Sequence, residues 1–185
     1  MLGQNFYGQL GRGQTGGKSQ TPQTITDISI KHLSAGHGHN CAVLDDQSVV
    51  CWGRNFEGQL GNGTSGGNAH SDLPVAVIGT NDALSVSSDY FHSCAVLANN
   101  SIKCWGANHN GQLGNDTKTN TNIPVAVSGI NNARSVSAGF SHSCALLESN
   151  NVVCWGSNTS GKLGNGTDKH ANSPIKSGPV LSPQE

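Results

Sequence analysis

The chain has 185 residues, of which 25 are glycine, only 5% are aromatic and 11% are charged. Its formal net charge of −1 offers no basic surface, so we expect no nucleic-acid partner and no binding to an anionic membrane. An apolar run of about 18 residues, the length that crosses a bilayer, is absent from the sequence, so we expect no membrane insertion.

The first 21 residues look like part of a repeat. The stretch LGQNFYGQLG aligns with WGRNFEGQLG and WGANHNGQLG further along, with Leu2 where the later copies have tryptophan. The start shows neither a basic nor an apolar leader region, so no secretion signal is visible. We expect residues 1–21 to be a partial repeat, as in a piece cut from a longer chain.

Marker residues recur at a fixed period along the whole chain. His39, His92 and His142 are separated by 53 and 50 residues, and the tryptophans of the three Cys-Trp-Gly copies follow the same steps. A constant period of this size is typical of a repeat architecture in which each unit packs against its neighbours. We therefore expect one repeat domain over residues 1–185. Because these residues are copied in every unit, we expect structural roles for them: His39, His92, His142, Trp52, Trp105 and Trp155.

Each repeat contains short runs that are typical of strands. Within 74–106, PVAVIG, ALSVSSD, SCAVL and SIKCWG have β-branched or period-two patterns bounded by Gly, Pro, Asn and Asp. Proline at the start of the first run is tolerable at a strand beginning or an edge. Four antiparallel strands about every 50 residues predict an all-β fold, a β-propeller with blades over 22–53, 74–106 and 124–156 and partial segments at 1–21 and 157–185.

Two cysteines lie ten residues apart in each repeat. If a hairpin turn is centred between them, the two face each other across adjacent strands, at a distance that a disulfide spans. We expect the disulfides Cys41–Cys51, Cys94–Cys104 and Cys144–Cys154, with free buried thiols as the alternative. Disulfides persist in oxidising compartments, so we expect an extracellular or periplasmic protein. Zinc is the other alternative, but each repeat supplies only His and two Cys, so we expect no metal.

The motifs G-x-x-H-S/N-C-A-L/V-L and C-W-G-x-N-x-x-G-Q-L-G-N-G resemble the regulator-of-chromosome-condensation repeat. The resemblance covers nearly the whole chain and implies seven-bladed propellers with four strands per blade. It also implies an interaction scaffold, because relatives include an exchange factor for the GTPase Ran, a photoreceptor, ubiquitin-ligase modules and a secreted β-lactamase inhibitor. Such relatives share a shape and differ in function. This chain departs from the pattern at Asp89, which replaces a glycine found at Gly36 and Gly139, a position where we expect positive φ.

Three blades do not close a circle, and an open arc exposes sheet faces and edges. The sequence leaves two solutions open. Either a homo-oligomer completes the ring, or the missing blades belong to a longer parent chain.

The loops after each Trp-Gly and before each repeated histidine vary between repeats, whereas one asparagine is constant. An active site needs an asymmetric constellation, and neither a nucleophile motif nor a phosphate-binding loop is evident. We therefore expect no enzyme and no cofactor, but a module that binds a protein partner, still unidentified, through one rim. Aromatic residues and Arg dominate interface hot spots. The candidate binding residues are Phe6, Tyr7, Arg54, Phe56, Glu57, Tyr90, Phe91 and His109.

Three alternatives remain open at this point. The aromatic residues among the candidates could instead pack between blades. The chain could be a guanine nucleotide exchange factor, although its only candidate insertion is three extra residues near TSGGNAHSD. It could also bind carbohydrate, because asparagine-rich loops with exposed rings suit sugars.

Overall fold

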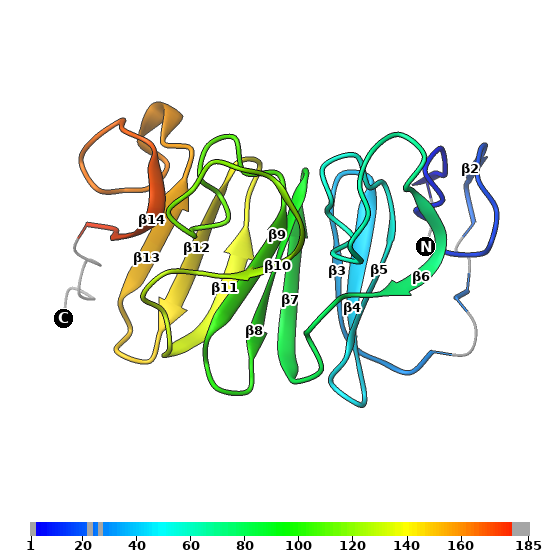
Figure 1. Ribbon diagram of the computed structural model, residues 1–185, viewed down its shortest axis with the longest axis horizontal. Helices are drawn as coiled ribbons and strands as arrows, with labels where there is room; N and C mark the ends of the chain where they lie inside the picture. The colour runs from blue at the N-terminus through cyan, green and yellow to red at the C-terminus, as the bar shows by residue number, and fades with distance from the viewer. Residues whose placement is uncertain (1–2, 22–23, 26–27, 179–185) are drawn as a thin grey trace.

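The computed structural model describes residues 3–21, 24–25 and 28–178, and they form three four-stranded antiparallel sheets and one two-stranded sheet. The three larger sheets stand side by side as an open row (Figure 1). The two-stranded sheet pairs β1 (Gly3–Gln4) with β2 (Lys18–Ser19). The first blade contains β3 (Ile30–Ala35), β4 (His39–Leu44), β5 (Val49–Gly53) and β6 (Ser71–Ala76). The second contains β7 (Ala83–Asp89), β8 (His92–Leu97), β9 (Ile102–Gly106) and β10 (Thr121–Ala126), and the third β11 (Ala133–Ala138), β12 (His142–Leu147), β13 (Val152–Gly156) and β14 (Ala171–Lys176).

The fold is therefore an all-β propeller built from consecutive blades, as the sequence predicts. Strands within a blade pair in chain order, so each blade is an antiparallel meander. The helical structure in the described ranges is one 3₁₀ turn at Thr159–Gly161. The segment 1–21 forms, in its described part, the two-stranded sheet, and Gly3 pairs with Ser19 just as Gly53 pairs with Ser71 in the first blade. It thus corresponds to the outer part of a blade.

The blade boundaries expected from the sequence are wrong, because the run predicted as the first strand of each blade is the last strand of the blade before it. The runs that begin at Pro74, Pro124 and Pro174 do not open a blade; they lie in β6, β10 and β14, the fourth strands of the preceding sheets. These are edge strands, and each proline lies within a register irregularity of its strand pair, where a missing N–H is tolerated. The equivalent run at Pro22 lies partly outside the described residues. The observed blades span 30–76, 83–126 and 133–176.

The second and third strands of each blade are joined by a tight hairpin with a polar turn. Its last residue has positive φ in all three blades, at Gln47, Asn100 and Asn150. In the first blade the Asp46 carboxylate accepts hydrogen bonds from the amide and hydroxyl of Ser48. The turn fixes the register, and the cysteines pair directly across it in every blade.

The three predicted disulfides are present: Cys41–Cys51, Cys94–Cys104 and Cys144–Cys154, with Cα–Cα distances of 4.0–4.1 Å. Each closes a loop across ten residues of sequence. The first two are completely buried at the interfaces between blades.

The hydrophobic core lies between blades rather than inside one. Cys41, Val43 and Val49 of the first blade pack with Ala95 and Trp105 of the second. The same arrangement recurs between the second and third blades. The inner strands β3, β7 and β11 contact each other in sequence. On the third blade the equivalent face lacks a neighbour among the described residues, and its side chains, such as Leu146 and Val152, are only half-buried.

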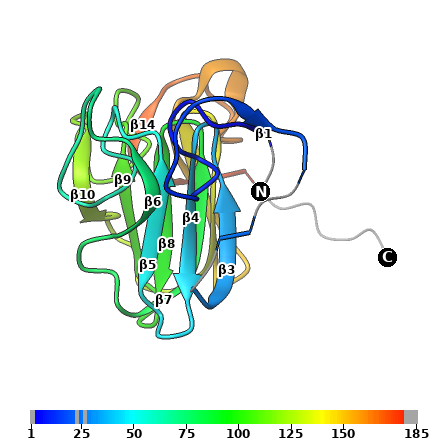
Figure 2. The same cartoon turned by 90° about the vertical axis from the view of Figure 1, so that its right-hand side faces the viewer.

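Figure 2 views the array from its first blade, with the β1–β2 segment lying over the top of that blade. In Figure 1 the hairpin turns between second and third strands lie along the lower edge, and the longer loops lie along the upper edge. The loops that carry the candidate binding residues all belong to this upper edge, so the fold collects them on one rim.

Candidate functional site

A buried asparagine organises each long loop of the upper rim. Asn5, Asn55, Asn108 and Asn158 are fully buried. The Oδ1 of Asn108 accepts a hydrogen bond from the Leu113 amide at 2.9 Å, and its Nδ2 donates to Asn115 and Thr117. The other copies accept the equivalent leucine amide in the same way. We call these four buried asparagines and their hydrogen bonds the asparagine frame. It fixes the backbone of each loop, so the side chains beside it can vary between repeats without changing the loop.

This frame explains most of the Asn-x-Ser/Thr sequences in the chain. In the first blade Thr64 Oγ1 donates to Asn62 Oδ1 at 2.8 Å, and Asn55 Nδ2 donates to both residues. The second and third blades repeat the contacts. The pattern therefore has a structural origin in the loop.

The repeated tryptophans and histidines join neighbouring blades. Trp105 Nε1 donates to the Gln59 carbonyl of the previous blade at 2.9 Å, and the other two tryptophans make the same bond. His39 Nε2 lies 2.8 Å from Ser93 Oγ, and His92 Nε2 lies 2.8 Å from Ser143 Oγ. These contacts give structural roles to the three tryptophans, His39 and His92, whereas the His142 ring makes no such hydrogen bond among the described residues.

The two inner histidines are held neutral. Ser143 Oγ donates to the Gln112 carbonyl, so the His92 Nε2–H must donate to the serine, and Nδ1 remains buried without a partner. Burial first, and then the neighbouring His142 imidazole, lowers the pKa of His92 to about 3. Burial, His92 and Arg54 likewise lower the pKa of His39 to about 3.

The expectation of positive φ at Gly36, Asp89 and Gly139 is wrong. None of the three has a left-handed backbone. The glycines are explained by space, because a Cβ at Gly36 would lie 2.7 Å from the imidazole of His39. A side chain there requires the ring to move.

Rings from the partial segment and all three blades lie along the upper rim in two groups. Tyr7 and Phe56 both pack on His70, each at 4.8 Å between ring centroids. Further along, Tyr90 contacts Phe91 at 4.0 Å and Phe140 at 4.2 Å. We call this set the aromatic stripe; its members are Tyr7, His37, Arg54, Phe56, His70, Tyr90, Phe91 and Phe140.

Arg54 joins the two halves of the aromatic stripe. Its guanidinium carbon lies 3.9 Å from the Phe91 ring centroid, 4.9 Å from that of Phe56 and 5.9 Å from that of Tyr7. A guanidinium over ring faces is held by cation–π attraction and still keeps its in-plane donors. Phe56 and Phe140 remain 42% and 56% exposed. The stripe therefore both connects the blades and presents apolar surface to solvent.

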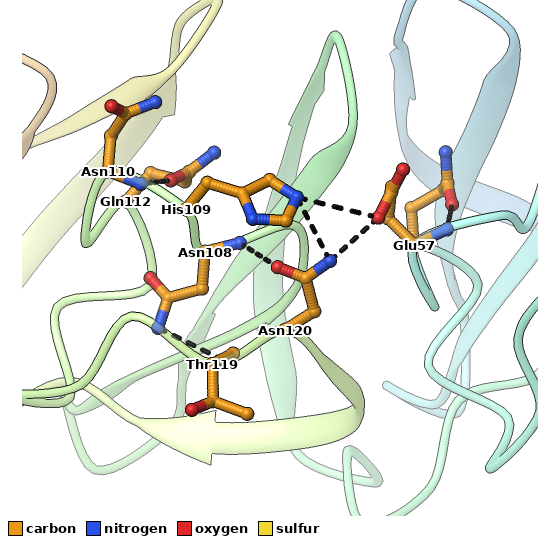
Figure 3. A network of polar contacts seen from close by, with 8 residues as sticks. Glu57, Asn108, His109, Asn110, Gln112, Thr119 and Asn120 are labelled. Carbon is orange, nitrogen blue, oxygen red and sulfur yellow. Dashed lines mark hydrogen bonds and ion pairs between the residues drawn. The ribbon is translucent and has the colours of Figure 1, made fainter.

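A separate polar network on the same rim joins Glu57, His109 and Asn120 (Figure 3). Asn120 Nδ2 donates to Glu57 Oε2 at 2.7 Å, and the His109 Nε2 lies 3.8 Å from the same oxygen. Asn120 Oδ1 also accepts the amide of Asn108. The network joins the loops of the first and second blades, and it borders a cavity of about 330 Å³.

The structure thus divides the candidate residues into groups. Tyr7, Arg54, Phe56, Tyr90 and Phe91 come together in the aromatic stripe, whereas Glu57 and His109 belong to the polar network. Phe6 is 63% exposed and makes no ring contact with the described residues.

Sequence reasoning missed His37, Phe140 and His70 as members of the stripe. The first two occupy the same repeat position as Tyr90, so the alignment of repeats held the signal for them. His70 gave a weaker signal, because it ends the longer loop of the first blade: Gly61 and Pro74 are 13 residues apart, whereas Gly114 and Pro124 are 10 apart.

Two further features of the described residues bear on chemistry. A cavity of about 360 Å³ lies next to the stripe and is lined by Gln4, Gln9, Leu10 and residues 35–40. In the part of the chain that the structure describes, no three His, Cys, Asp or Glu side chains gather closely enough to hold a metal ion. Nor do these residues include a helix long and apolar enough to cross a membrane.

The chain matches known repeat families over most of its length. A family model described as the regulator of chromosome condensation (RCC1) repeat matches residues 1–43, 46–96 and 103–146. A second RCC1 repeat model matches residues 30–59, 85–112 and 133–162. Both models match in three copies, in agreement with the three blades.

Individual relatives are more distant and longer than this chain. The probable E3 ubiquitin-protein ligase HERC6 of Homo sapiens is 33% identical over 114 residues, which are 60% of this chain and 11% of HERC6. Human WBSCR16 is 22% identical with a TM-score of 0.75, over 92% of this chain and 44% of that one. Yeast RCC1 (Prp20), solved bound to Kap60, is 20% identical with a TM-score of 0.80, over 97% of this chain and 43% of that one. At these identities the solved structures show a shared fold.

Proposed function

Because this chain belongs to the regulator of chromosome condensation (RCC1) repeat family, we propose that it is a non-enzymatic module that binds a protein through the aromatic stripe. The observation that carries the proposal is the aromatic stripe itself. Two groups of rings, which come from four successive repeat units and are joined by Arg54, lie on one rim at positions where the repeats differ. Partly exposed aromatic residues around an arginine have the composition of interface hot spots.

The surface is also preorganised. Tyr7, Arg54 and Phe56 are placed by loops whose backbone is fixed by a buried asparagine, such as Asn55, which accepts the Leu60 amide and donates to the Thr64 carbonyl. Rings that already pack on each other lose little conformational freedom when a partner binds, so less of the binding energy is lost to ordering.

Carbohydrate binding and nucleotide exchange would each require other features of this rim. Carbohydrate binding uses free ring faces, but the faces of Phe91 and Phe56 lie against the Arg54 guanidinium. For an exchange factor, the candidate insertion in the first blade would have to reach a GTPase. Instead Gly67 lies against Phe56, and His70 packs between two rings, so the insertion folds onto the stripe. Both observations favour protein binding at the stripe itself.

The proposal is tested by affinity capture from an extract of the source organism. A double variant, Phe56→Ser with Phe140→Ser, removes two exposed phenylalanine rings of the stripe, one from each group. The matched control is Leu84→Ser, which changes a side chain of similar exposure (47%) on β7. Proteins held by wild type and control but lost from the double variant support the proposal. Identical captured proteins on all three would contradict it, provided that circular dichroism shows each variant folded.

We also propose an oxidising compartment, extracellular or periplasmic. The support is the disulfide in every blade, since such bonds are rare where thiols are kept reduced. Titration of free thiols in protein taken rapidly from its source tests this. The proposal expects no free thiol, and six reactive thiols after unfolding without reductant would refute it.

A further inference from the structure

Within the described part of the chain, the charge of Arg54 has no counter-ion, because no Asp or Glu there lies within ion-pair distance of its guanidinium. The Nη1 atom is buried and has no hydrogen-bond acceptor. The rings of Phe91, Phe56 and Tyr7 therefore supply the attraction that holds this cation in place.

The field of this uncompensated cation reaches the neighbouring imidazoles. Burial and then the Arg54 guanidinium lower the pKa of His70, which packs between Tyr7 and Phe56. Arg54 is also among the groups that lower the pKa of His39. A partly buried cation without an acceptor is costly, and a charge-assisted hydrogen bond from outside would offset that cost.

We infer that Arg54 is the anchor of a recognition site for an acidic peptide segment, whose Asp or Glu carboxylate binds the guanidinium while flanking apolar residues pack on the aromatic stripe. The ring faces hold the flat sides of the guanidinium. Because Nη1 is buried, a carboxylate from outside would bind the remaining donors, Nε–H and Nη2–H, along one edge of the group. The inference rests on the proposed function, since it names the kind of partner that the stripe would bind.

The surroundings favour a carboxylate over a phosphate. A phosphate monoester carries close to two charges at neutral pH and is bound by clusters of arginines. The stripe offers one arginine, and burial keeps His70 largely neutral. A single cation among rings suits a single negative charge next to an aromatic or aliphatic side chain.

A pocket for a flanking side chain lies beside Arg54. The cavity of about 360 Å³ is lined by His37 and Gly38, and a Cβ placed at Gly38 would lie 3.4 Å from the Cβ of Arg54. The cavity wall combines Leu10 with the polar groups of Gln9 and Asn40. It can accept one side chain of a bound segment while the carboxylate contacts the arginine.

The test uses the full chain and a random dodecapeptide library displayed on phage. Enriched peptides are synthesised, and their affinities are measured for wild type, Arg54→Gln and the control Arg134→Gln, which removes an exposed arginine on β11. Each peptide is also made with its acidic residue replaced by the amide. We expect enriched peptides with Asp or Glu beside an aromatic or aliphatic residue. Both the Arg54 change and the amide change should weaken binding about tenfold or more, and the two losses should not add.

The outcomes separate this inference from the proposed function. Peptides that lack an acidic residue, bind Arg54→Gln as well as wild type, and lose affinity with Phe56→Ser would overturn the acidic class and leave protein binding at the stripe intact. Peptides that bind the Phe56→Ser, Phe140→Ser double variant as tightly as wild type would overturn both, and so would a failure to enrich any peptide.

Discussion

Replacing the two inner histidines should remove most of the acid sensitivity of this protein between pH 7 and pH 5. His39 and His92 are fully buried, each bonded through Nε2 to a serine of the next blade. Protonation would put a charge and an N–H group at Nδ1, which has no partner. The perturbation is the double variant His39→Gln, His92→Gln, which keeps polar atoms at both sites and cannot titrate.

The magnitude follows from the difference between the folded and unfolded pKa. Burial lowers the pKa of both groups to about 3, whereas an unfolded histidine titrates at about 6.5. Because the folded state binds fewer protons, the free energy of unfolding is greatest above pH 6.5 and falls as the pH drops toward 3. From pH 7 to pH 5 an unfolded histidine goes from about a quarter protonated to almost fully protonated. This stabilises the unfolded state and so lowers the free energy of unfolding by about 2 kcal/mol per group, or about 4 kcal/mol for the pair.

Urea denaturation at pH 7.0 and pH 5.0 measures this difference. We expect wild type to lose about 4 kcal/mol more of its free energy of unfolding over this range than the double variant does. The control is His32→Gln, an exposed side chain on β3, which should behave as wild type. If the double variant shows the same pH dependence as wild type, the two histidines are not held neutral by burial, and the reasoning fails.

Three further changes test the contacts that build the blades. Trp105→Phe removes a buried hydrogen bond to a carbonyl of the previous blade, and should lower the free energy of unfolding by about 1–3 kcal/mol in urea denaturation. An unchanged free energy of unfolding would show that this bond does not stabilise the protein. Replacing Cys94 and Cys104 together by alanine should cost about 2–3 kcal/mol, and reductant should then have less effect on the melting temperature than in wild type; equal sensitivity would contradict the pairing. Asn108→Ala leaves the buried Leu113 amide without its acceptor, so we expect the free energy of unfolding to fall by about 1–3 kcal/mol and hydrogen exchange at that amide to become faster. Unchanged exchange would contradict the role of Asn108 in fixing the loop.

The candidate site could be predicted only in part. The sequence identified Arg54 and Phe56 because the repeats differ beside a constant asparagine, and Phe91 because they differ just before the repeated histidine. It did not show that one guanidinium covers two of these rings, since that contact joins loops of different blades. Nor did it separate Glu57 and His109 from the aromatic residues. Which variable side chains meet depends on the angle between neighbouring blades, and no single repeat encodes that angle.

The sequence by itself determined the period, the strand pattern and which cysteines face each other in this protein. Cysteines ten residues apart on either side of a polar turn lie opposite each other in a hairpin, so local geometry is sufficient to pair Cys94 with Cys104 and likewise in its copies. Tertiary structure alone decided where each blade begins. A periodic sequence can be divided at any point of its repeat, and only the pairing of β6 with β5 assigns the proline-containing run to the outer edge of the preceding sheet. The same packing decided the aromatic stripe, because its members lie on one rim only when successive sheets stand side by side.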